Sequence, residues 1–307
     1  MISQPRLKVP LTFDLAATAA PEIFYAFGAV DSPAPDQALH IQADVGRYRL
    51  RLAATAADRE AACRLRFRVF NLELGEGLDS SFETGLDSDC FDSVCEHLLV
   101  EEKTSRRVVG TYRMQSGQTA RRHFGYYSEQ EFCLSPYEPL RPEILELGRA
   151  SIDREHRTPE VLMLLWRGIA QYATAMGLRY LLGCSSLNSN DPVEGWRMYR
   201  QLENFRVPRE FETAPTAAYA CPPELPDADA LPLPCQIDGS LPEGAPASTV
   251  APAKVPKLLK TYLAIGARIA APPAWDRAFR TIDFLTLLDL QSLSSAARNR
   301  FLGPLCM

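Results

Sequence analysis

Single charged residues stand inside apolar, strand-like segments between positions 66 and 149 of this chain. These segments read LRFRVF, EHLLV, VVGTYRM and ILELGRASI. A solvated surface tends to carry its charges in runs, whereas here each charge has hydrophobic or strand-forming neighbours. Burying a charge is costly unless a group of opposite charge accompanies it. The pattern therefore indicates either a structural network of ion pairs or a polar active site.

Composition and charge are those of a globular protein without a nucleic-acid-binding surface. The 307 residues are 46% hydrophobic and 23% charged, with a net charge of -5, and such a chain forms one large domain or two smaller ones. No apolar run reaches the roughly 20 residues of a membrane span, and the N-terminus lacks the regions of a signal peptide. Eight cysteines without a CxxC pair are typical of reduced thiols. We therefore expect a cytoplasmic protein.

The start of the chain predicts an arm, a strand and a helix. Residues 1–45 are rich in alanine and proline without a sustained period, so we expect a mobile arm. Arg47–Ala54 alternates apolar residues with arginines, which indicates a half-buried strand. Asp58 is expected to cap a helix that continues to Leu72.

A mixed α/β sheet is predicted for a single domain over residues 46–307. His97–Glu102 and Arg107–Met114 read as the two strands of a hairpin. Ile144–Ile152, a helix over Val161–Met176 and the strand YLLGCSS then form a right-handed crossover between parallel strands.

The C-terminal third contains an irregular segment followed by further regular elements. Residues 206–256 are dense in proline and alanine, and we interpret their central part as an excursion on the surface. Residues 257–307 form a C-terminal extension of the same domain. Within it we expect an amphipathic helix, a strand near Ile282–Leu288 and a short terminal helix.

The charged positions recur at fixed spacings, in the order Arg66-x-x-x-Phe70, Asp89-x-x-Asp92, Arg113 after Gly110, and Glu146-x-x-Arg149. This set resembles the charged residues of acyl-homoserine-lactone synthases. The segments DSDCFDSVCEHLLV, LELGRASIDREHR and PKLLKTYLAIGARIAAPPAWDRAF are more similar to bacterial ornithine-acyl-ACP N-acyltransferases, a hemolysin-like group of the GNAT superfamily. The resemblance extends from about Arg47 to about Leu290.

The resemblance implies a GNAT-like fold in which two central parallel strands splay apart. Unpaired backbone groups there would bind the pantetheine arm of an acyl donor, and one backbone amide would hold the thioester oxygen as charge develops. Donor contacts are expected from Ala150, Ser151 and Ile152 on the first splayed strand. Cys184 and Ser185 are expected to contribute from the second.

The resemblance also implies roles for the charged residues near the reacting groups. Glu146 would accept the proton of the attacking amine, directly or through water. Arg149 and Arg113 would bind the carboxylate of an amino-acid acceptor, because guanidinium groups match carboxylates in shape and charge.

Three further charged residues would complete the acceptor site. Asp89 and Asp92 would hold a cationic side chain such as that of ornithine, while Arg66 would organise the loop around them. For each acid, an ordinary salt bridge with one of the arginines is the alternative interpretation.

The segment after the first splayed strand reads DREHRTPEV and contains no glycine. Acetyl-CoA users carry a glycine-containing loop there, whose amides bind pyrophosphate at a helix N-terminus. We therefore expect acyl carrier protein as donor, with no resident cofactor, because the 4'-phosphopantetheine arrives on that protein. Arg154, His156 and Arg157 could meet its single phosphate, or they are plain loop charges.

Covalent and metal-dependent mechanisms are not favoured by the sequence. Cys184 and Ser185 end the second splayed strand, but no histidine is placed to activate them. Cys90, Cys95 and His97 lie close together, but a tetrahedral metal site needs a fourth ligand and histidine is scarce. Direct attack of an amine on a thioester needs no covalent intermediate.

The expected activity is transfer of a 3-hydroxyacyl chain from acyl carrier protein to the α-amine of an amino acid. With ornithine as acceptor the product would be a lyso-ornithine lipid. The alternatives are another acceptor, such as glycine or tyrosine, or acyl-homoserine-lactone synthesis. A non-catalytic lipid-binding module is the alternative from a different class.

The segment Lys254–Arg268 is predicted to be an amphipathic helix that contacts a partner. Lys254, Lys257 and Lys260 cluster near its start, and they could dock an acidic carrier protein or the anionic surface of an inner membrane. In the alternative interpretation, its apolar stripe packs on the sheet and the lysines are solvated.

Overall fold

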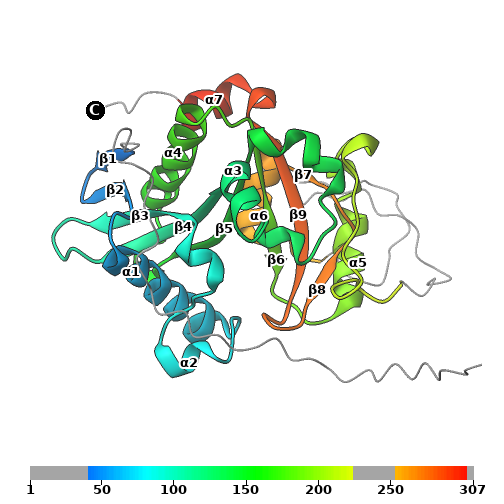
Figure 1. Ribbon diagram of the computed structural model, residues 1–307, viewed down its shortest axis with the longest axis horizontal. Helices are drawn as coiled ribbons and strands as arrows, with labels where there is room; N and C mark the ends of the chain where they lie inside the picture. The colour runs from blue at the N-terminus through cyan, green and yellow to red at the C-terminus, as the bar shows by residue number, and fades with distance from the viewer. Residues whose placement is uncertain (1–40, 224–252, 303–307) are drawn as a thin grey trace, which may run out of the picture.

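The computed structural model describes residues 41–223 and 253–302. The described residues form one nine-stranded sheet in the order β1-β2-β3-β4-β5-β6-β9-β7, with β8 paired to β9 (Figure 1). β5 and β6 are parallel, and the other neighbouring pairs are antiparallel. The strands are β1 (Gln42–Val45), β2 (Tyr48–Leu52), β3 (Glu96–Glu102), β4 (Val108–Ser116), β5 (Ile144–Ile152), β6 (Tyr180–Leu187), β7 (Arg268–Ile269), β8 (Ala274–Asp276) and β9 (Thr281–Asp289).

Helices cover both faces of this sheet. The α-helices are α1 (Ala56–Phe67), α2 (Ser81–Thr84), α3 (Gly117–Arg122), α4 (Pro159–Ala175), α5 (Pro192–Gln201), α6 (Lys257–Ala264) and α7 (Ser295–Leu302). A π-helical segment continues α1, and short 3-10 turns join other elements. These segments include Arg68–Leu74, Cys90–Ser93, Tyr127–Glu129 and Ser135–Glu143. The α/β fold class is as predicted.

Successive residues of β3 show how the helices divide between the faces. Side chains alternate along a strand, and Leu98 packs in the same core cluster as Leu165 of α4. Leu99 instead packs with Leu65 of α1. α4 and α1 therefore lie on opposite faces of the sheet.

The predicted strand–helix–strand crossover is confirmed. β5 has the predicted bounds, and the observed helix α4 starts at Pro159, with the side chain of Thr158 accepting a hydrogen bond from Val161 N. β3 and β4 form the predicted hairpin. Among the described residues, no helix is long and apolar enough to cross a membrane.

The predicted start of the first helix was wrong by three residues. Thr55 is the N-cap, and Asp58 lies in the first turn, where its carboxylate accepts from the backbone amide of Thr55. This reciprocal arrangement is a capping box, so Asp58 contributes to the cap without being the cap residue. The expected apolar stripe also ends early, since Leu72 is 60% exposed.

The predicted arm and excursion fall partly outside the described residues. Residues 1–40 and 224–252 lie there. Gln42–Val45, expected in the arm, instead form the edge strand β1. The first part of the excursion is packed against the sheet, because Val207 N donates to Ile269 O.

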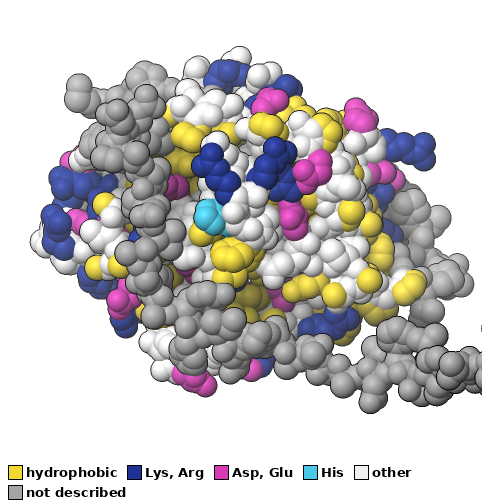
Figure 2. Space-filling view, viewed as in Figure 1, with side chains coloured by type: hydrophobic (Ala, Val, Ile, Leu, Met, Phe, Trp, Pro, Cys, Tyr) yellow, Lys and Arg dark blue, Asp and Glu magenta, His cyan; other side chains and the backbone are white. Residues whose placement is uncertain are grey.

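The charges on the visible surface are mixed. On the face in Figure 2, basic and acidic side chains are interspersed among separate hydrophobic patches. Among the described residues visible there, the basic side chains form no continuous stripe.

Candidate active site

The two parallel strands separate after three paired residues. Ile144–Glu146 pairs with Tyr180–Leu182, whereas β5 stays paired with β4 as far as Ile152. At the point of separation the strands touch closely, since a Cβ on Gly183 would lie 2.2 Å from Leu147 O. The backbone of β5 beyond this point faces a space on its β6 side.

A bulge in β5 accompanies the separation. Thr111 pairs with Ser151 and Arg113 with Gly148, so two residues of β5 lie opposite Tyr112 alone. One of them, Arg149, has a φ of 53°, a conformation that is unfavourable for a residue with a Cβ. Bulges bend a strand and redirect its side chains, so this one helps to open the sheet and to set the direction of Arg149.

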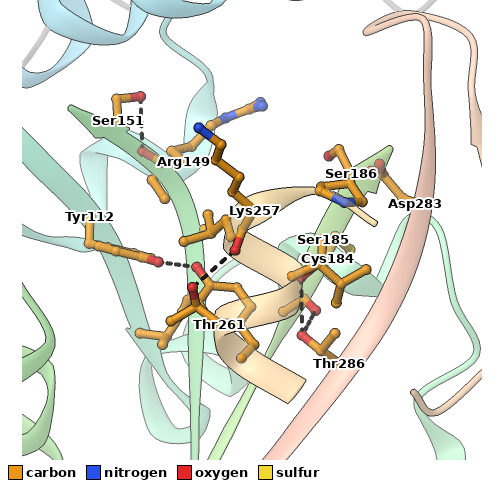
Figure 3. Close-up of a pocket in the computed structure, with 18 of the residues that line it drawn as sticks. Tyr112, Arg149, Ser151, Cys184, Ser185, Ser186, Lys257, Thr261, Asp283 and Thr286 are labelled. Carbon is orange, nitrogen blue, oxygen red and sulfur yellow. Dashed lines mark hydrogen bonds between the residues drawn. The ribbon is translucent and has the colours of Figure 1, made fainter. Parts of the chain in front are cut away.

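A cavity of about 1600 Å³ occupies the space between the separated strands. It is larger than the roughly 300–1,000 Å³ of most small-molecule pockets. Leu165 and Trp166 line it from the α4 side, and Glu146 and Ser128 line it from the other face. Figure 3 shows residues of β5, β6, α6 and β9 converging on it. The cavity is therefore lined from both faces of the sheet.

Glu146 is held by three donors at the edge of this cavity. Its Oε2 accepts from Tyr127 N at 2.8 Å, and its Oε1 accepts from Ser128 N at 2.8 Å and from Ser128 Oγ at 2.6 Å. Burial raises the pKa of Glu146, although the hydrogen bonds from Ser128 and Tyr127 and the charge of Arg113 oppose that rise. A buried carboxylate with a raised pKa is suited to accept a proton.

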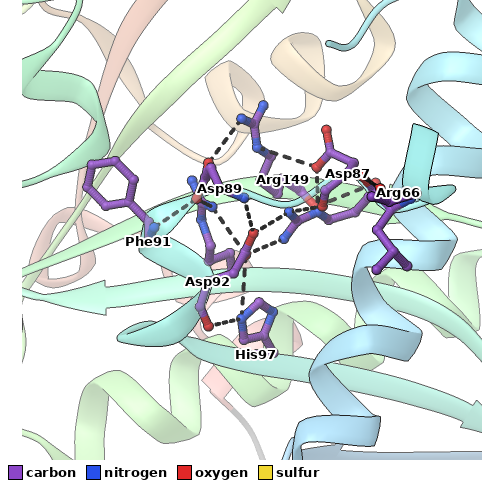
Figure 4. Close-up of polar contacts among 11 residues, drawn as sticks. Arg66, Asp87, Asp89, Phe91, Asp92, His97 and Arg149 are labelled. Atoms are coloured by element: carbon purple, nitrogen blue, oxygen red, sulfur yellow. Dashed lines mark hydrogen bonds and ion pairs between the residues drawn. The ribbon is translucent and has the colours of Figure 1, made fainter. Parts of the chain in front are cut away.

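Arg66 and Asp92 form the centre of a buried ion-pair network (Figure 4). The guanidinium of Arg66, which is 1% exposed, donates to Asp92 Oδ1 at 2.6 Å, to Asp92 Oδ2 at 2.8 Å and to Asp87 Oδ1 at 2.7 Å. Burial opposes ionisation of Asp92, but Arg66 and Arg113 hold its pKa well below its usual range. Neither Arg66 nor Asp92 lines the cavity, so the centre of the network lies behind the cavity wall.

Arg113 and Arg149 connect this network to the cavity, which both of them line. Arg113 Nη1 lies 2.6 Å from Asp89 Oδ1 and 3.2 Å from Asp92 Oδ1. Arg149 is held more loosely, at 3.3 Å from Asp89 and 3.7 Å from Asp87. Asp89 is therefore engaged by two arginines and does not line the cavity.

Aromatic rings complete the environment of Arg149. Its guanidinium lies 4.3 Å from the ring centre of Phe279 and 5.0 Å from that of Tyr127. Its buried Nε has no hydrogen-bond partner among the described residues. Arg149 is thus positioned by stacking on two rings and by its ion pairs with Asp87 and Asp89.

Most of the predicted donor-side residues line the cavity. The lining members are Ala150, Ser151, Ile152, Arg157, Cys184 and Ser185. Arg154 is exposed and does not line it. Arg157 is paired with Glu73 at 2.6 and 2.8 Å, and His156 Nδ1 lies 3.1 Å from Tyr48 Oη. The expected trio for the donor phosphate is therefore dispersed.

Burial shifts the pKa values of Cys184 and His97, the remaining candidate nucleophile and base. Burial raises the pKa of the Cys184 thiol well above its usual range, so the thiolate is scarce at neutral pH. Burial lowers the pKa of His97 to about 4, and its Nε2 contacts Asp92 O at 3.3 Å.

Three acids at the other end of the cavity were missed by the sequence interpretation. Asp276 and Asp283 line the cavity, and Glu131 lies behind them in the protein interior. Ligand atoms of Glu131, Cys184 and Asp283 all lie within 4.8 Å of one another. The segment AWDRAF, which contains Asp276, was noted only as part of the resemblance, and no local pattern indicates that β8 and β9 bring it to β6.

Known proteins provide an independent comparison. Residues 65–167 match the acetyltransferase (GNAT) domain family. The chain is 31% identical over 275 residues to an L-ornithine N(alpha)-acyltransferase of Brucella abortus, covering 84% of this chain and 92% of that protein. This chain belongs to the L-ornithine N(alpha)-acyltransferase family. A second member, from Rhizobium meliloti, is 31% identical over 89% of each chain.

Solved structures are more distant. An N-acyl amino acid synthase from uncultured soil microbes matches 81% of this chain and 95% of its own, with 12% identity and a TM-score of 0.46. The AHL synthase LasI matches 85% of this chain and 97% of its own chain, with 12% identity and a TM-score of 0.42.

The arrangement suits an acyltransferase, as expected for a member of this family. A buried carboxyl group, that of Glu146, lies where two strands separate. Two arginines and three acids lie at the cavity walls or just behind them. The described residues thus place both basic and acidic side chains around one buried carboxyl group.

Proposed function

We propose that this enzyme transfers a fatty acyl chain from an acyl carrier protein to the α-amine of L-ornithine and releases lyso-ornithine lipid. The observation that carries the proposal is the position of Glu146, a buried carboxylate at the separation of β5 and β6 inside a large cavity. The curated relatives are named for ornithine acylation, which supports the choice of acceptor.

The donor arm would enter between the separated strands. Amides and carbonyls of β5 beyond Leu147 face the cavity without a β6 partner, and the arm can pair with them as an added strand. The acyl chain would lie on the α4 side, where Leu165, Trp166 and Tyr262 line an apolar wall. The hydroxyl of Tyr262 is hydrogen-bonded to that of Tyr112, which fixes α6 over this wall.

The amine would attack from the Glu146 side of the sheet. Its nitrogen forms a bond to the thioester carbon, the carbon–sulfur bond breaks, and the sulfur leaves as the thiol after taking up a proton. Oε2 of Glu146 accepts only the bond from Tyr127 N, so it retains a lone pair for the amine proton. Arg149, whose Nε makes no hydrogen bond and lies 3.7 Å from Asp87 Oδ1, would bind the acceptor carboxylate together with Arg113.

The donor is proposed to be a carrier protein because the loop before α4 lacks the features that bind the pyrophosphate of CoA. The loop has no glycine, and its Arg157 is neutralised by Glu73 at 2.6 Å. A single phosphate outside the cavity needs fewer binding groups from the protein than the nucleotide of CoA does. Exposed Arg154 and the lysines of α6 remain for it.

The decisive experiment measures release of free thiol from 3-hydroxyacyl carrier protein while amino acids are offered one at a time. Release with ornithine is expected, and acyl-CoA at micromolar concentration should give little. Comparable turnover with acyl-CoA would refute the donor assignment. Release with another amino acid but not with ornithine would refute the acceptor.

Glu146→Gln tests the chemical role of the base. It should lower turnover on the order of 10²–10⁴-fold while the thermal midpoint of unfolding stays close to wild type. Glu143→Gln is the matched control, since Glu143 is exposed and lies three residues earlier. If folded Glu146→Gln protein kept normal specific activity, another proton acceptor would have to be sought.

A further inference from the structure

Glu131, Asp276 and Asp283 converge at the end of the cavity formed by β6, β8 and β9. Asp283 pairs with Ser186 across β6 and β9 and with Ala274 across β8 and β9. Asp276 closes β8. Glu131 reaches the same place from the segment between β4 and β5, within 4.8 Å of Asp283 and Cys184. Figure 3 shows Asp283 and Cys184 on the β9 side of the cavity.

No cation neutralises this cluster. Among the described residues, none of the three acids forms a salt bridge, whereas Asp87, Asp89 and Asp92 all do. Asp276 is satisfied in part, because its Oδ1 accepts from Ala278 N at 2.9 Å and from Phe279 N at 3.0 Å. The cluster nevertheless keeps several carboxyl groups together with no positive partner.

Buried oxygen atoms in the cluster also lack donors. Among the described residues, no donor outside the cluster reaches the carboxylate oxygens of Glu131, which is 0% exposed, and its hydrogen-bonding neighbours are Asp283 and Cys184. Oδ1 of Asp283, which is 5% exposed and lines the cavity, makes no hydrogen bond of good geometry with the described residues, although Ser186 and Thr281 lie near this carboxylate. Unpaired buried carboxyl groups are costly, so a missing donor with positive charge would stabilise this end of the cavity.

The cluster lies next to the reacting groups. Cys184 Sγ donates to Ser128 Oγ at 3.6 Å, and Ser128 Oγ donates to Glu146. Cys184 therefore stands between Glu146 and the acids. A ligand whose amine reaches Glu146 can extend an aliphatic arm past Cys184 to Asp283.

We propose that Glu131 and Asp283 bind the side-chain ammonium of the acceptor, with Asp276 at the rim. This subsite rests on the proposed function and deepens it, because it selects acceptors with a second amine. Asp89 and Asp92, expected from the sequence to hold that ammonium, are already engaged by arginines. A primary ammonium donates three hydrogen bonds, and the cluster offers the unpartnered acceptors.

A metal ion fits the cluster less well than an ammonium. The third nearby ligand atom is the Cys184 thiol, and burial among acids raises its pKa well above its usual range. Metals bind the thiolate, not the thiol. A neutral thiol beside an alkyl arm is instead an ordinary apolar contact.

The test compares ornithine with norvaline, which has the same carbon chain and no side-chain amine. In thiol-release assays with purified full-length enzyme, Asp283→Asn should lower kcat/KM for ornithine on the order of 10- to 100-fold. It should leave kcat/KM for norvaline unchanged or higher. Glu131→Gln should act in the same direction. Asp289→Asn is the matched control on the same strand, because Asp289 pairs with Arg179, and it should keep the wild-type preference.

Two results would overturn the subsite. An equal fall for ornithine and norvaline in Asp283→Asn would mean that the aspartate only supports the fold. Loss of ornithine preference in the wild-type enzyme on treatment with EDTA, restored by Zn²⁺, would assign the cluster to a metal. Both results leave the proposed function standing, whereas a wild-type enzyme inactive on ornithine would refute that function first.

Discussion

Ser128 donates both its backbone amide and its hydroxyl to the same oxygen of Glu146, at 2.8 and 2.6 Å. The same hydroxyl accepts from the thiol of Cys184 at 3.6 Å. Ser128 thus links the base to the wall where the acids cluster. Because hydrogen bonds to a carboxylate favour its charged form, Ser128 also limits how far burial raises the pKa of Glu146.

Ser128→Ala should shift the acid limb of the pH profile of kcat/KM to higher pH. The variant keeps both backbone donors and loses one hydrogen bond to a charged group, worth about 1.5–3 kcal/mol, or roughly one to two pKa units. With Glu146 as the proposed base, activity rises with pH through its pKa, so the loss should be large at pH 6 and small at pH 9. A uniform loss at every pH would mean that Ser128 only positions Glu146.

Gly183→Ala and Gly148→Ala should separate stability from activity. A Cβ on Gly183 would collide with Leu147 O at 2.2 Å, whereas a Cβ on Gly148 meets nothing within 4 Å. Overpacking costs about 1–3 kcal/mol, so Gly183→Ala should lower the midpoint of urea unfolding. Gly148→Ala should fold normally but lose turnover, because its methyl group would enter the donor path. Equal stability of both variants would contradict the tight seam at Leu147.

Arg66→Met should destabilise the protein by about 3–5 kcal/mol, because it leaves Asp87 and Asp92 charged and buried without their partner. Arg64→Met is the control on the same helix. Arg64 pairs with Glu60 at the surface, and such pairs contribute about 0–1 kcal/mol. Chemical denaturation measures both variants, and similar effects would show that the network is not structural.

Asp283 should make the free enzyme less stable at alkaline pH. Burial and Asp276 raise its pKa to about 6, so the folded state binds the proton more tightly than the unfolded chain. Below the pKa of an aspartate in the unfolded chain, near 3.9, Asp283 does not lower the free energy of unfolding. The free energy of unfolding falls as the pH rises from there to about 6, and the loss stays constant at higher pH. Asp283→Asn should therefore raise the thermal midpoint at pH 8 more than at pH 4. The opposite pH order in calorimetry would contradict this.

Changing Lys254, Lys257 and Lys260 together to Glu should raise KM for acyl carrier protein. The apolar side of α6 is buried through Leu259 and Leu263, as in the packing interpretation, while all three lysines line the cavity entrance. An acidic partner would be repelled, and added salt should reduce the difference from wild type.

Arg121, Arg122 and Arg209 changed to Glu form the charge-matched control. All three are exposed and lie outside the cavity lining, so KM should change little. Loss of binding to anionic liposomes with unchanged KM in the lysine variant would assign the lysines to a membrane. An unchanged KM and unchanged liposome binding would leave only packing.

Strand positions were predictable because their signal is local. Alternation in Arg47–Ala54 and the apolar run of Ile144–Ile152 reflect which side chains are buried, and β2 and β5 appear there. The first residue of helix α1 was harder to predict, because two nearby side chains could both cap it. Thr55 and Asp58 each have an oxygen that can cap, and only the backbone conformation of Thr55 decides between them.

The site was predictable only where one strand carries it. Glu146 and Arg149 share β5, so their common cavity follows from the strand alone. The sequence does not show which acidic residues form ion pairs, because the partner can be far away along the chain. Asp92, for example, binds an arginine that is 26 residues away. Asp283 reaches Glu131 through the late strand β9, and such distant pairing leaves no trace in a local pattern.

The short seam between β5 and β6 makes the sheet two half-sheets in mechanical terms. Within the described part of the chain, only Ile144–Glu146 and its three partners join them by backbone pairing. Arg113 and Arg149 belong to one half, and Asp276 and Asp283 belong to the other. An acceptor bound through its carboxylate to one half and through its ammonium to the other would connect the two halves across the β5–β6 seam. Acceptor occupancy would then set the angle between the halves, and with it the width of the slot that admits the donor.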